Sequence, residues 1–399
     1  MNAPAFAPFR RFWITRVCTI MAFQMQAVAL GWQVYALHHR AMDLAWVGLI
    51  SFMPAVLLML IIGQAADHFE RRKLAMTCQV VSCLLALGLA WHSRSAPPGR
   101  DLLFAFIFLL GSAKAFESPA LAAMLPELVD AEHLPRAISA SSAAMQVAVI
   151  AGPALGGLLY AVAPVAVYIG AASLYLGALA AIAPLRRPRQ RVSAPPRWHT
   201  MLAGIRYIWE RRILLGTLSL DLFAVLLGGA TALLPMVAHD ILRAGPLGLG
   251  LLRSAPAAGA LIVSLWLSRH TLRHAGRWMF VAVGGFGVCT IVFGLSHSMP
   301  LSLLALATAG ASDMISVVIR SAMVQLETPN DMRGRVSAVN FLFIGTSNQL
   351  GEFESGVTAA CLGAEKAIVL GGLGSLLIAA LWYRYFPEMH RYSGTTTQA

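Results

Sequence analysis

Long uncharged stretches separated by short charged segments are the dominant pattern of this sequence. Stretches of about twenty apolar residues, which span the apolar core of a bilayer as a helix, recur along the chain. Ala163-Pro164 marks the break between two neighbouring stretches. The pattern predicts twelve transmembrane helices, over residues 12–38, 45–66, 74–92, 102–125, 136–161, 163–184, 213–239, 247–268, 278–296, 300–326, 335–360 and 366–386.

The longest polar interval separates these stretches into two groups of six. It is rich in arginine and proline, and it predicts an N-terminal six-helix bundle over 1–185, a cytoplasmic basic linker over 186–212 and a C-terminal six-helix bundle over 213–399. Within the linker, residues 198–209 are either an amphipathic helix on the inner leaflet or part of a solvated basic segment.

The two halves repeat each other at an offset of 199 residues. The segment G-S-A-K at 111 aligns with G-A-S-D at 310, and the register continues without a gap to Gly157 and Gly356. A repeat of this kind predicts two pseudo-symmetric bundles of six helices each.

Composition and charge agree with a membrane protein. The chain has 399 residues, of which 58% are hydrophobic and only 12% are charged, too apolar for a single soluble core. The net charge of +12 comes from Lys and Arg in short loops, so it indicates topology and not nucleic acid binding. We expect both termini on the cytoplasmic side.

A dense charge cluster, G-Q-A-A-D-H-F-E-R-R-K-L at 63–74, lies between the second and third predicted helices. It resembles the signature at this place in the major facilitator superfamily of secondary transporters, although His68 and Glu70 depart from it. The E-R-R-K form is similar to the enterobactin-exporter branch. The residues that match are Gly63, Asp67, Arg71 and Arg72.

Three further segments carry the same resemblance. G-P-A-L-G-G at 152–157 resembles the helix-5 motif of drug/proton antiporters, and the segments 221–235 and 329–337 resemble the enterobactin-exporter branch. The resemblance implies a twelve-helix fold in two pseudo-symmetric bundles. It also implies export of a siderophore, drug or amphiphile across a bacterial inner membrane, by proton antiport with alternating access.

The resemblance also implies roles for individual residues. It places Gly63, Asp67, Arg71, Arg72, Arg136, Arg333 and Arg335 at a cytoplasmic gate. Small residues let helices approach closely, and a helix-packing surface is expected at Gly152, Pro153, Gly156, Gly157, Gly351 and Gly356.

Carboxylates inside predicted helices are costly in a membrane and are candidates for proton coupling. Asp221 has no basic residue nearby in the sequence, which makes it the first candidate. Glu352 and Glu354 are alternatives, and because successive helix positions point about 100° apart, one of them could be held in a buried ion pair instead.

The remaining intramembrane polar residues are candidates for a substrate cavity. Lys114 and Asp313 are equivalent in the repeat and could face each other, or Lys114 could pair locally with Glu117. Arg320 is also a candidate, although extension to the membrane surface is the simpler interpretation for it and for Arg16. The cavity candidates are Lys114, Glu117, Asp313, Arg320 and Gln24.

No enzymatic chemistry is predicted. The sequence contains no phosphate-binding loop, no H-E-x-x-H and no nucleophile elbow. The expected partners are a small-molecule substrate, protons and membrane lipids, with a functional monomer and with no cofactor, metal or nucleic acid. An importer or lipid flippase of the same fold, or a membrane sensor that transports nothing, remains the alternative.

Overall fold

The structure is a computed structural model that describes residues 7–59, 61–62, 65, 69–95, 99–130, 132–185, 198–270, 272, 274–390 and 392. Over these residues it consists of helices and connecting turns, with no β-strand. The helices of the first half are α1 (Ala7–His38), α2 (Ala41–Leu57), α4 (Arg71–Ser95), α5 (Arg100–Leu128), α6 (Leu134–Val162) and α7 (Pro164–Ile182).

The second half contains a longer series of elements. They are α8 (Trp198–Glu210), α9 (Arg212–Leu227), η1 (Ala230–Leu233), α10 (Leu234–Met236), η2 (Val237–Ile241), α11 (Gly245–Leu267), α12 (Ala275–Gly294), α13 (Met299–Leu326), α14 (Asn330–Leu362), α15 (Ala364–Tyr385) and α16 (Pro387–His390).

Most of these helices have the length and composition of membrane spans. In the part of the chain that the structure describes, ten helical segments are long and apolar enough to cross a membrane, with Arg212–Ile241 as one of them. The shorter apolar helix α2 and the more polar, 33-residue α14 bring the number to the twelve predicted from the sequence. The all-α membrane fold is therefore confirmed.

The chain forms two compact units. The first unit comprises Met1–His39, Ile50–Pro195 and Ala244–Ser254, and the second comprises Arg40–Leu49, Pro196–Arg243 and Ala255–Ala399. The predicted division into 1–185, 186–212 and 213–399 stays a prediction, and most of the predicted linker, 186–197, lies outside the described residues.

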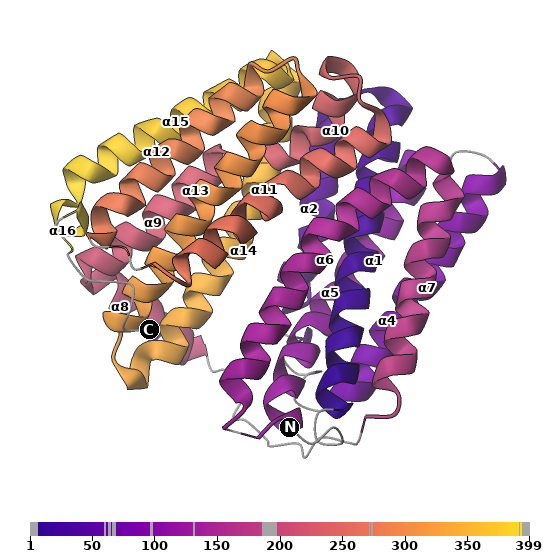
Figure 1. The fold of residues 1–399 in the computed structure, drawn as a ribbon, viewed down its shortest axis with the longest axis horizontal. Coiled ribbons are helices and arrows are strands. Elements are labelled where there is room, and N and C mark those ends of the chain that lie inside the picture. The colour runs from indigo at the N-terminus through magenta and orange to yellow at the C-terminus, as the bar shows by residue number, and fades with distance from the viewer. Residues whose placement is uncertain are drawn as a thin grey trace. The chain divides into compact units, whose positions relative to one another are not determined.

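In the first unit, α1 packs against α6 and α7, and α4 packs against α5 and α7 (Figure 1). The interfaces are made by apolar side chains that exclude solvent, such as Phe12, Met124 and Ile182 in one cluster. Proline begins α7, where the missing backbone N–H costs nothing. The predicted break at Ala163-Pro164 is thus confirmed.

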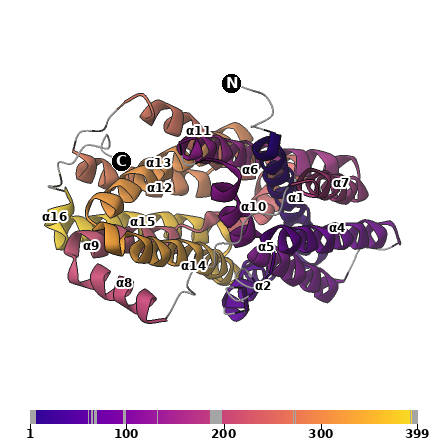
Figure 2. The ribbon, with the colours of Figure 1, turned by 90° about the horizontal axis from the view of Figure 1, so that it is seen from below.

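In the second unit, α12 packs against α13 and α15, while α9 packs against α14 and α15 (Figure 2). Gly363, which joins α14 to α15, has a φ of 88°, a left-handed conformation that favours glycine. The sequence repeat is visible in the element boundaries, because α5 and α13 begin 199 residues apart, at Arg100 and Met299.

The helix α8 belongs to the second unit and packs on α9 and α14. Ile208 on this helix is 1% exposed and lies in a cluster with Leu214 and Val336, whereas Trp209 is 68% exposed. The sequence offered a leaflet-bound helix or a solvated linker. The structure shows that this segment is a helix with one apolar face packed on the bundle, and its position at the inner leaflet stays a prediction.

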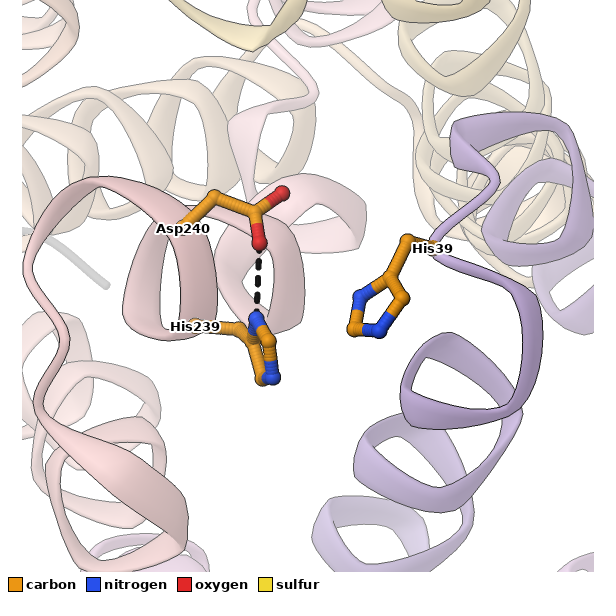
Figure 3. Close-up of side chains that lie close together, drawn as sticks. All are labelled: His39, His239 and Asp240. Atoms are coloured by element: carbon orange, nitrogen blue, oxygen red, sulfur yellow. Dashed lines mark hydrogen bonds and ion pairs between the residues drawn. The ribbon is translucent and has the colours of Figure 1, made fainter.

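The seventh predicted span is not one continuous α-helix. After α9 ends, Gly228 and Gly229 separate it from the 3₁₀ turn η1, and the π-helical turn η2 follows. In η2 the His239 Nδ1 and Asp240 Oδ1 atoms lie 2.7 Å apart. Figure 3 marks this contact with a dashed line. Non-helical backbone inside a membrane span is tolerated where it is buried in protein or lines a polar cavity.

The distribution of side chains is the reverse of that in a soluble protein. Leu84 and Leu304 are 62% and 65% exposed, whereas Gln79 and Arg320 are 0% and 3% exposed. Apolar outer faces need lipid as their solvent, and polar groups inside the bundle need a functional or pairing reason. The polar interior is where the candidate site lies.

Candidate functional site

A cavity of about 220 Å³ lies inside the first unit, between α1, α4, α5, α6 and α7. Its polar lining residues are Arg16, Thr19 and Gln24 on α1, Ser82 on α4, Lys114, Glu117 and Ser118 on α5, and Tyr175 on α7. Its apolar lining residues are Ile20, Phe23, Leu110, Leu121, Met145 and Val149. Three of the predicted cavity residues, Gln24, Lys114 and Glu117, are therefore brought together.

Helical periodicity explains why these residues share one wall. On α5 the lining residues Leu110, Lys114, Glu117 and Leu121 are spaced three or four positions apart, and Ser118 directly follows Glu117. Such positions lie on one face of a helix, one turn apart. The lining residues of α5 therefore form one face of the helix, and this face borders the cavity.

Glu117 is buried at 5% exposure, with a neutral amide as its hydrogen-bond donor and Lys114 as its electrostatic neighbour on the same helix. Gln79 Nε2 donates a hydrogen bond to Glu117 Oε1 at 2.9 Å, and the same amide nitrogen lies 3.5 Å from Thr19 Oγ1. A buried carboxyl needs such donors, because loss of hydration is otherwise uncompensated. Glu117 is thus fixed at the cavity wall.

Two cationic side chains extend into the same cavity. Lys114 Nζ lies 3.6 Å from the centre of the Phe23 ring, a cation–π contact between α5 and α1. Arg16 Nη1 donates to Ser141 Oγ at 2.8 Å, and its Nη2 lies 3.7 Å from Met145 Sδ. Arg16 was interpreted from the sequence as a residue that extends to the membrane surface, and its place at the cavity corrects that interpretation.

A second, much smaller cavity of about 10 Å³ lies inside the second unit, between α9, α12 and α13. This is about the space of one water molecule. Its lining residues are Asp221, Ala224, Val225, Ala282, Val283, Phe286, Asp313 and Ser316. Two acidic residues from different helices therefore share one small polar space.

Asp221 forms an ion pair with Nη1 of Arg320 on α13, and the two side chains are 8% and 3% exposed. The expectation that Asp221 lacks a cationic partner is wrong, because its partner is 99 positions away in the sequence. The expectation that Arg320 extends to the membrane surface is wrong for the same reason. The guanidinium remains inside the bundle because the carboxylate offsets its desolvation.

Asp313 lies two helical turns before Arg320 on α13. Among the described residues, none lies within hydrogen-bond or ion-pair distance of its carboxyl group. The cluster of Asp221, Asp313 and Arg320 thus contains two acids and one base. Whether Asp313 faces Lys114 stays a prediction.

The two α14 acids have different surroundings. Thr358 Oγ1 donates to Glu354 Oε1 at 2.7 Å, so Glu354 is bonded within its own helix. Glu352 points toward α2, where a Cβ added at Gly48 would lie 3.1 Å from Glu352 Oε2. The two side chains thus have different neighbours.

Glycines of the predicted packing motif lie at close helix contacts. A Cβ at Gly157 would lie 2.4 Å from the Pro246 carbonyl oxygen of α11, and one at Gly156 would lie 2.8 Å from Met25 Cα of α1. Neither substitution fits without separating the helices.

The other glycines of the motif show similar contacts. A Cβ at Gly152 would lie 2.7 Å from Gln24 Cβ, one at Gly351 would lie 2.9 Å from the Leu226 carbonyl oxygen, and one at Gly356 would lie 2.6 Å from Ala45 Cβ. The carbonyl of Pro153 would lie 2.4 Å from a Cβ at Gly250.

The basic end of the charge cluster ties three helices of the first unit together. Arg71, at the start of α4, forms an ion pair with Glu127 at the end of α5. Arg72 Nη1 donates to the carbonyl oxygens of Ala183 and Leu185 beyond α7, at 3.0 and 2.6 Å. Lys73, in contrast, is 64% exposed.

Other predicted gate residues are only partly visible. Gly63 and Asp67 lie outside the described residues, as does the side chain of Arg333. Arg136 is exposed at the start of α6, and Arg335 Nη1 lies 3.3 Å from Met332 Sδ. Their role at a gate stays a prediction.

Residues 3–394 of the sequence match a family described as transmembrane secretion effector. It is 25% identical to the enterobactin exporter EntS of Escherichia coli O1:K1 over 403 aligned residues, which cover 98% of this chain and 94% of that protein. A second EntS, from Escherichia coli O127:H6, is also 25% identical over 98% of this chain and 94% of the relative.

Solved structures of transporters share the fold. The nucleoside transporter NupG has a TM-score of 0.72 at 14% identity, covering 98% of this chain and 100% of that one. A bacterial homologue of the iron transporter ferroportin has a TM-score of 0.71 at 16% identity, with the same coverage of 98% and 100%. These similarities establish the architecture, and the site must be interpreted from its own residues.

Proposed function

We propose that this chain, which belongs to the transmembrane secretion effector family of the major facilitator superfamily, exports small molecules across a bacterial inner membrane by proton antiport with alternating access. Membership of the family makes it a multi-pass membrane transporter and not an enzyme. The direction of transport, the use of protons and the inner-membrane location, with both termini cytoplasmic, are part of the proposal. The relatives named as enterobactin exporters support export.

The observation that carries the proposal is the pair of unlike polar cavities inside the two units. The larger cavity, with Lys114 and Glu117, has room for part of an organic substrate. The smaller one, with Asp221 and Asp313, has room for one water molecule, which suits a proton and not a substrate. A membrane sensor would not need two ionisable cavities.

The proton site is assigned to Asp313, next to the Asp221–Arg320 ion pair. Among the described residues Asp313 has no ion-pair partner, so it can exchange a proton without breaking a salt bridge, whereas protonation of Asp221 would leave Arg320 unpaired. This assignment moves the first candidate from Asp221 to Asp313, because Asp221 is already balanced by Arg320. Glu352 and Glu354 remain alternative proton carriers.

The cytoplasmic gate is assigned to the charged network that begins with Arg71 and Arg72, together with Gly63, Asp67, Arg136, Arg333 and Arg335. Arg71 and Arg72 hold the ends of α5 and α7 to the start of α4. A network that ties helix ends together favours one conformation, and a substrate or proton can shift that balance only through different affinities for the two states. The transporter is proposed to act as a monomer.

The proposal is tested in proteoliposomes with an imposed pH gradient, with anionic, neutral and cationic fluorescent compounds as probes. We expect at least one probe to move uphill in the direction opposite to proton flow, and a protonophore to abolish this movement. Uphill movement in the same direction as the protons would make the protein an importer or symporter. Movement of labelled lipids alone would indicate a flippase.

A further inference from the structure

We propose that the cavity of the first unit binds organic anions, with the anionic group between Arg16 and Lys114 and an aromatic or apolar body against Phe23. This inference names a substrate class for the proposed export function and rests on it. It follows from the charge, the shape and the wall of the cavity.

The charge balance of the cavity favours an anion. Its lining includes two cations, Arg16 on α1 and Lys114 on α5, and a single acid, Glu117. Even with Glu117 ionised, the lining carries a net positive charge. Inside a bundle, where water screens poorly, this excess attracts an anion and repels a cation.

The two cations are presented differently from the acid. Arg16 donates to a neutral partner, the Ser141 hydroxyl, and its guanidinium has further donors available for a carboxylate, sulfonate or phosphate. Glu117 is 5% exposed, and its Oε1 already accepts a hydrogen bond from Gln79. A ligand entering the cavity therefore meets the Arg16 guanidinium more readily than the Glu117 carboxylate.

The rest of the cavity wall is apolar and favours a ligand with an aromatic or aliphatic part. Phe23 presents its ring next to Lys114, and Ile20, Leu110 and Val149 complete an apolar surface. An aromatic ligand can stack on such a ring while its acidic group contacts the ammonium. Small inorganic anions would leave this surface unfilled.

The cavity volume sets the size of the ligand. At about 220 Å³ it is smaller than the roughly 300 to 1,000 Å³ of drug-sized sites. It therefore holds a compound of two or three rings, or the acidic aromatic end of a larger one.

The test uses three fluorescent probes of known charge, with purified protein in lipid nanodiscs and empty nanodiscs as the background. 1-Anilinonaphthalene-8-sulfonate is the anion, N-phenyl-1-naphthylamine is the same skeleton without the sulfonate, and ethidium is an aromatic cation. We expect the anion to bind most tightly, by about tenfold over its neutral analogue after background subtraction, which is the effect of one good charged interaction.

Variants locate the binding. Lys114→Gln and Arg16→Gln should each weaken binding of the anion about tenfold and leave the neutral analogue within roughly twofold, and Lys114→Arg should retain anion binding. Lys366→Gln is the matched control, because Lys366 is an exposed lysine at the start of α15 and is not among the residues that line the cavity. It should leave all three affinities unchanged.

The outcomes separate this inference from the proposed function. Equal binding of the neutral analogue, a preference for ethidium, no binding of any probe, or equal effects of Lys114→Gln and Lys366→Gln would overturn the inference. If proteoliposomes transport ethidium but not the anion, export stands and the substrate class is wrong. If the anion binds as expected but no pH gradient drives its transport, the substrate class stands and the transport proposal fails.

Discussion

The cavities of the two units occupy related places in the sequence repeat but contain different chemistry. At the offset of 199 residues, Lys114 on α5 corresponds to Asp313 on α13, and Leu121 corresponds to Arg320. On α5 these positions line a cavity of about 220 Å³, whereas α13 borders one of about 10 Å³. The same helix framework therefore supports a ligand-sized space in one half and a closed ionic cluster in the other.

The difference follows from the pairing of the charges. In the second unit, Arg320 turns inward to Asp221, and the pair is buried among apolar side chains. In the first unit, Leu121 replaces the arginine, and Lys114 and Arg16 line an open space. We infer from this contrast that the first unit binds substrate while the second responds to protons.

The largest expected effect is on the stability of the second unit. Asp221→Asn or Arg320→Gln leaves a buried charge without its partner, which costs about 3 to 5 kcal/mol. The double variant should recover much of the lost thermal stability, measured as the melting temperature in detergent. Arg16→Gln, whose closest partners are neutral, should lower stability by no more than about 1 kcal/mol. Additive losses in the double variant would contradict the pair.

The next effect concerns the glycine contacts of α6 and α14. Gly157→Ala and Gly356→Ala would bring a methyl group within 2.4 Å of a carbonyl oxygen and 2.6 Å of another Cβ, respectively. We expect transport to fall about tenfold or more in both variants. The helices must move apart to make room for the added methyl group, which costs roughly 1 to 3 kcal/mol. Gly345→Ala is the control on α14, since no atom lies within 4 Å of its added Cβ. An equal loss in the control would remove the packing explanation.

A smaller, selective effect is expected at the start of α4. Arg71→Ala breaks the ion pair with Glu127 and should reduce transport strongly at normal expression, whereas Lys73→Ala should be mild because Lys73 is 64% exposed. The measurement is the transport rate of each variant, divided by the amount of that variant inserted in the membrane. Equal defects at both positions would point to a role in membrane topology instead of the gate.

The smallest expected effect is the coupling between Lys114 and Asp313. If the two equivalent residues act in one transport cycle, single neutralisations should each impair transport. The double variant should be impaired roughly three- to tenfold less than additivity predicts. Effects that simply multiply would show that the two residues act independently.

The twelve-helix fold could be predicted because each membrane span is a local stretch of about twenty apolar residues, which can be recognised without knowledge of the tertiary structure. The break at Pro164 was visible for the same reason. The interruption of the seventh span was missed, although the signal was present in the Gly228-Gly229 pair. Hydrophobicity predicts the length of a span and not its backbone geometry, so a stretch with 3₁₀ and π turns is predicted as one continuous helix.

The candidate site was only partly predictable. Lys114, Glu117 and Gln24 were found because polar residues inside apolar helices stand out. The partner of Asp221 was not found, because Arg320 lies on another helix and no spacing rule connects them. Arg16 was missed because its position near a helix end suggested a surface role.

The most direct test of the account is transport by Asp313→Asn in proteoliposomes, with whichever probe the wild-type protein moves. Two rates are measured in the same preparation: uphill accumulation driven by an imposed pH gradient, and exchange of labelled for unlabelled probe without a gradient. The account predicts that Asp313→Asn loses uphill accumulation and retains exchange, while Lys114→Gln loses both at limiting probe concentration. Undiminished uphill accumulation by Asp313→Asn would contradict the division of substrate and proton between the two units.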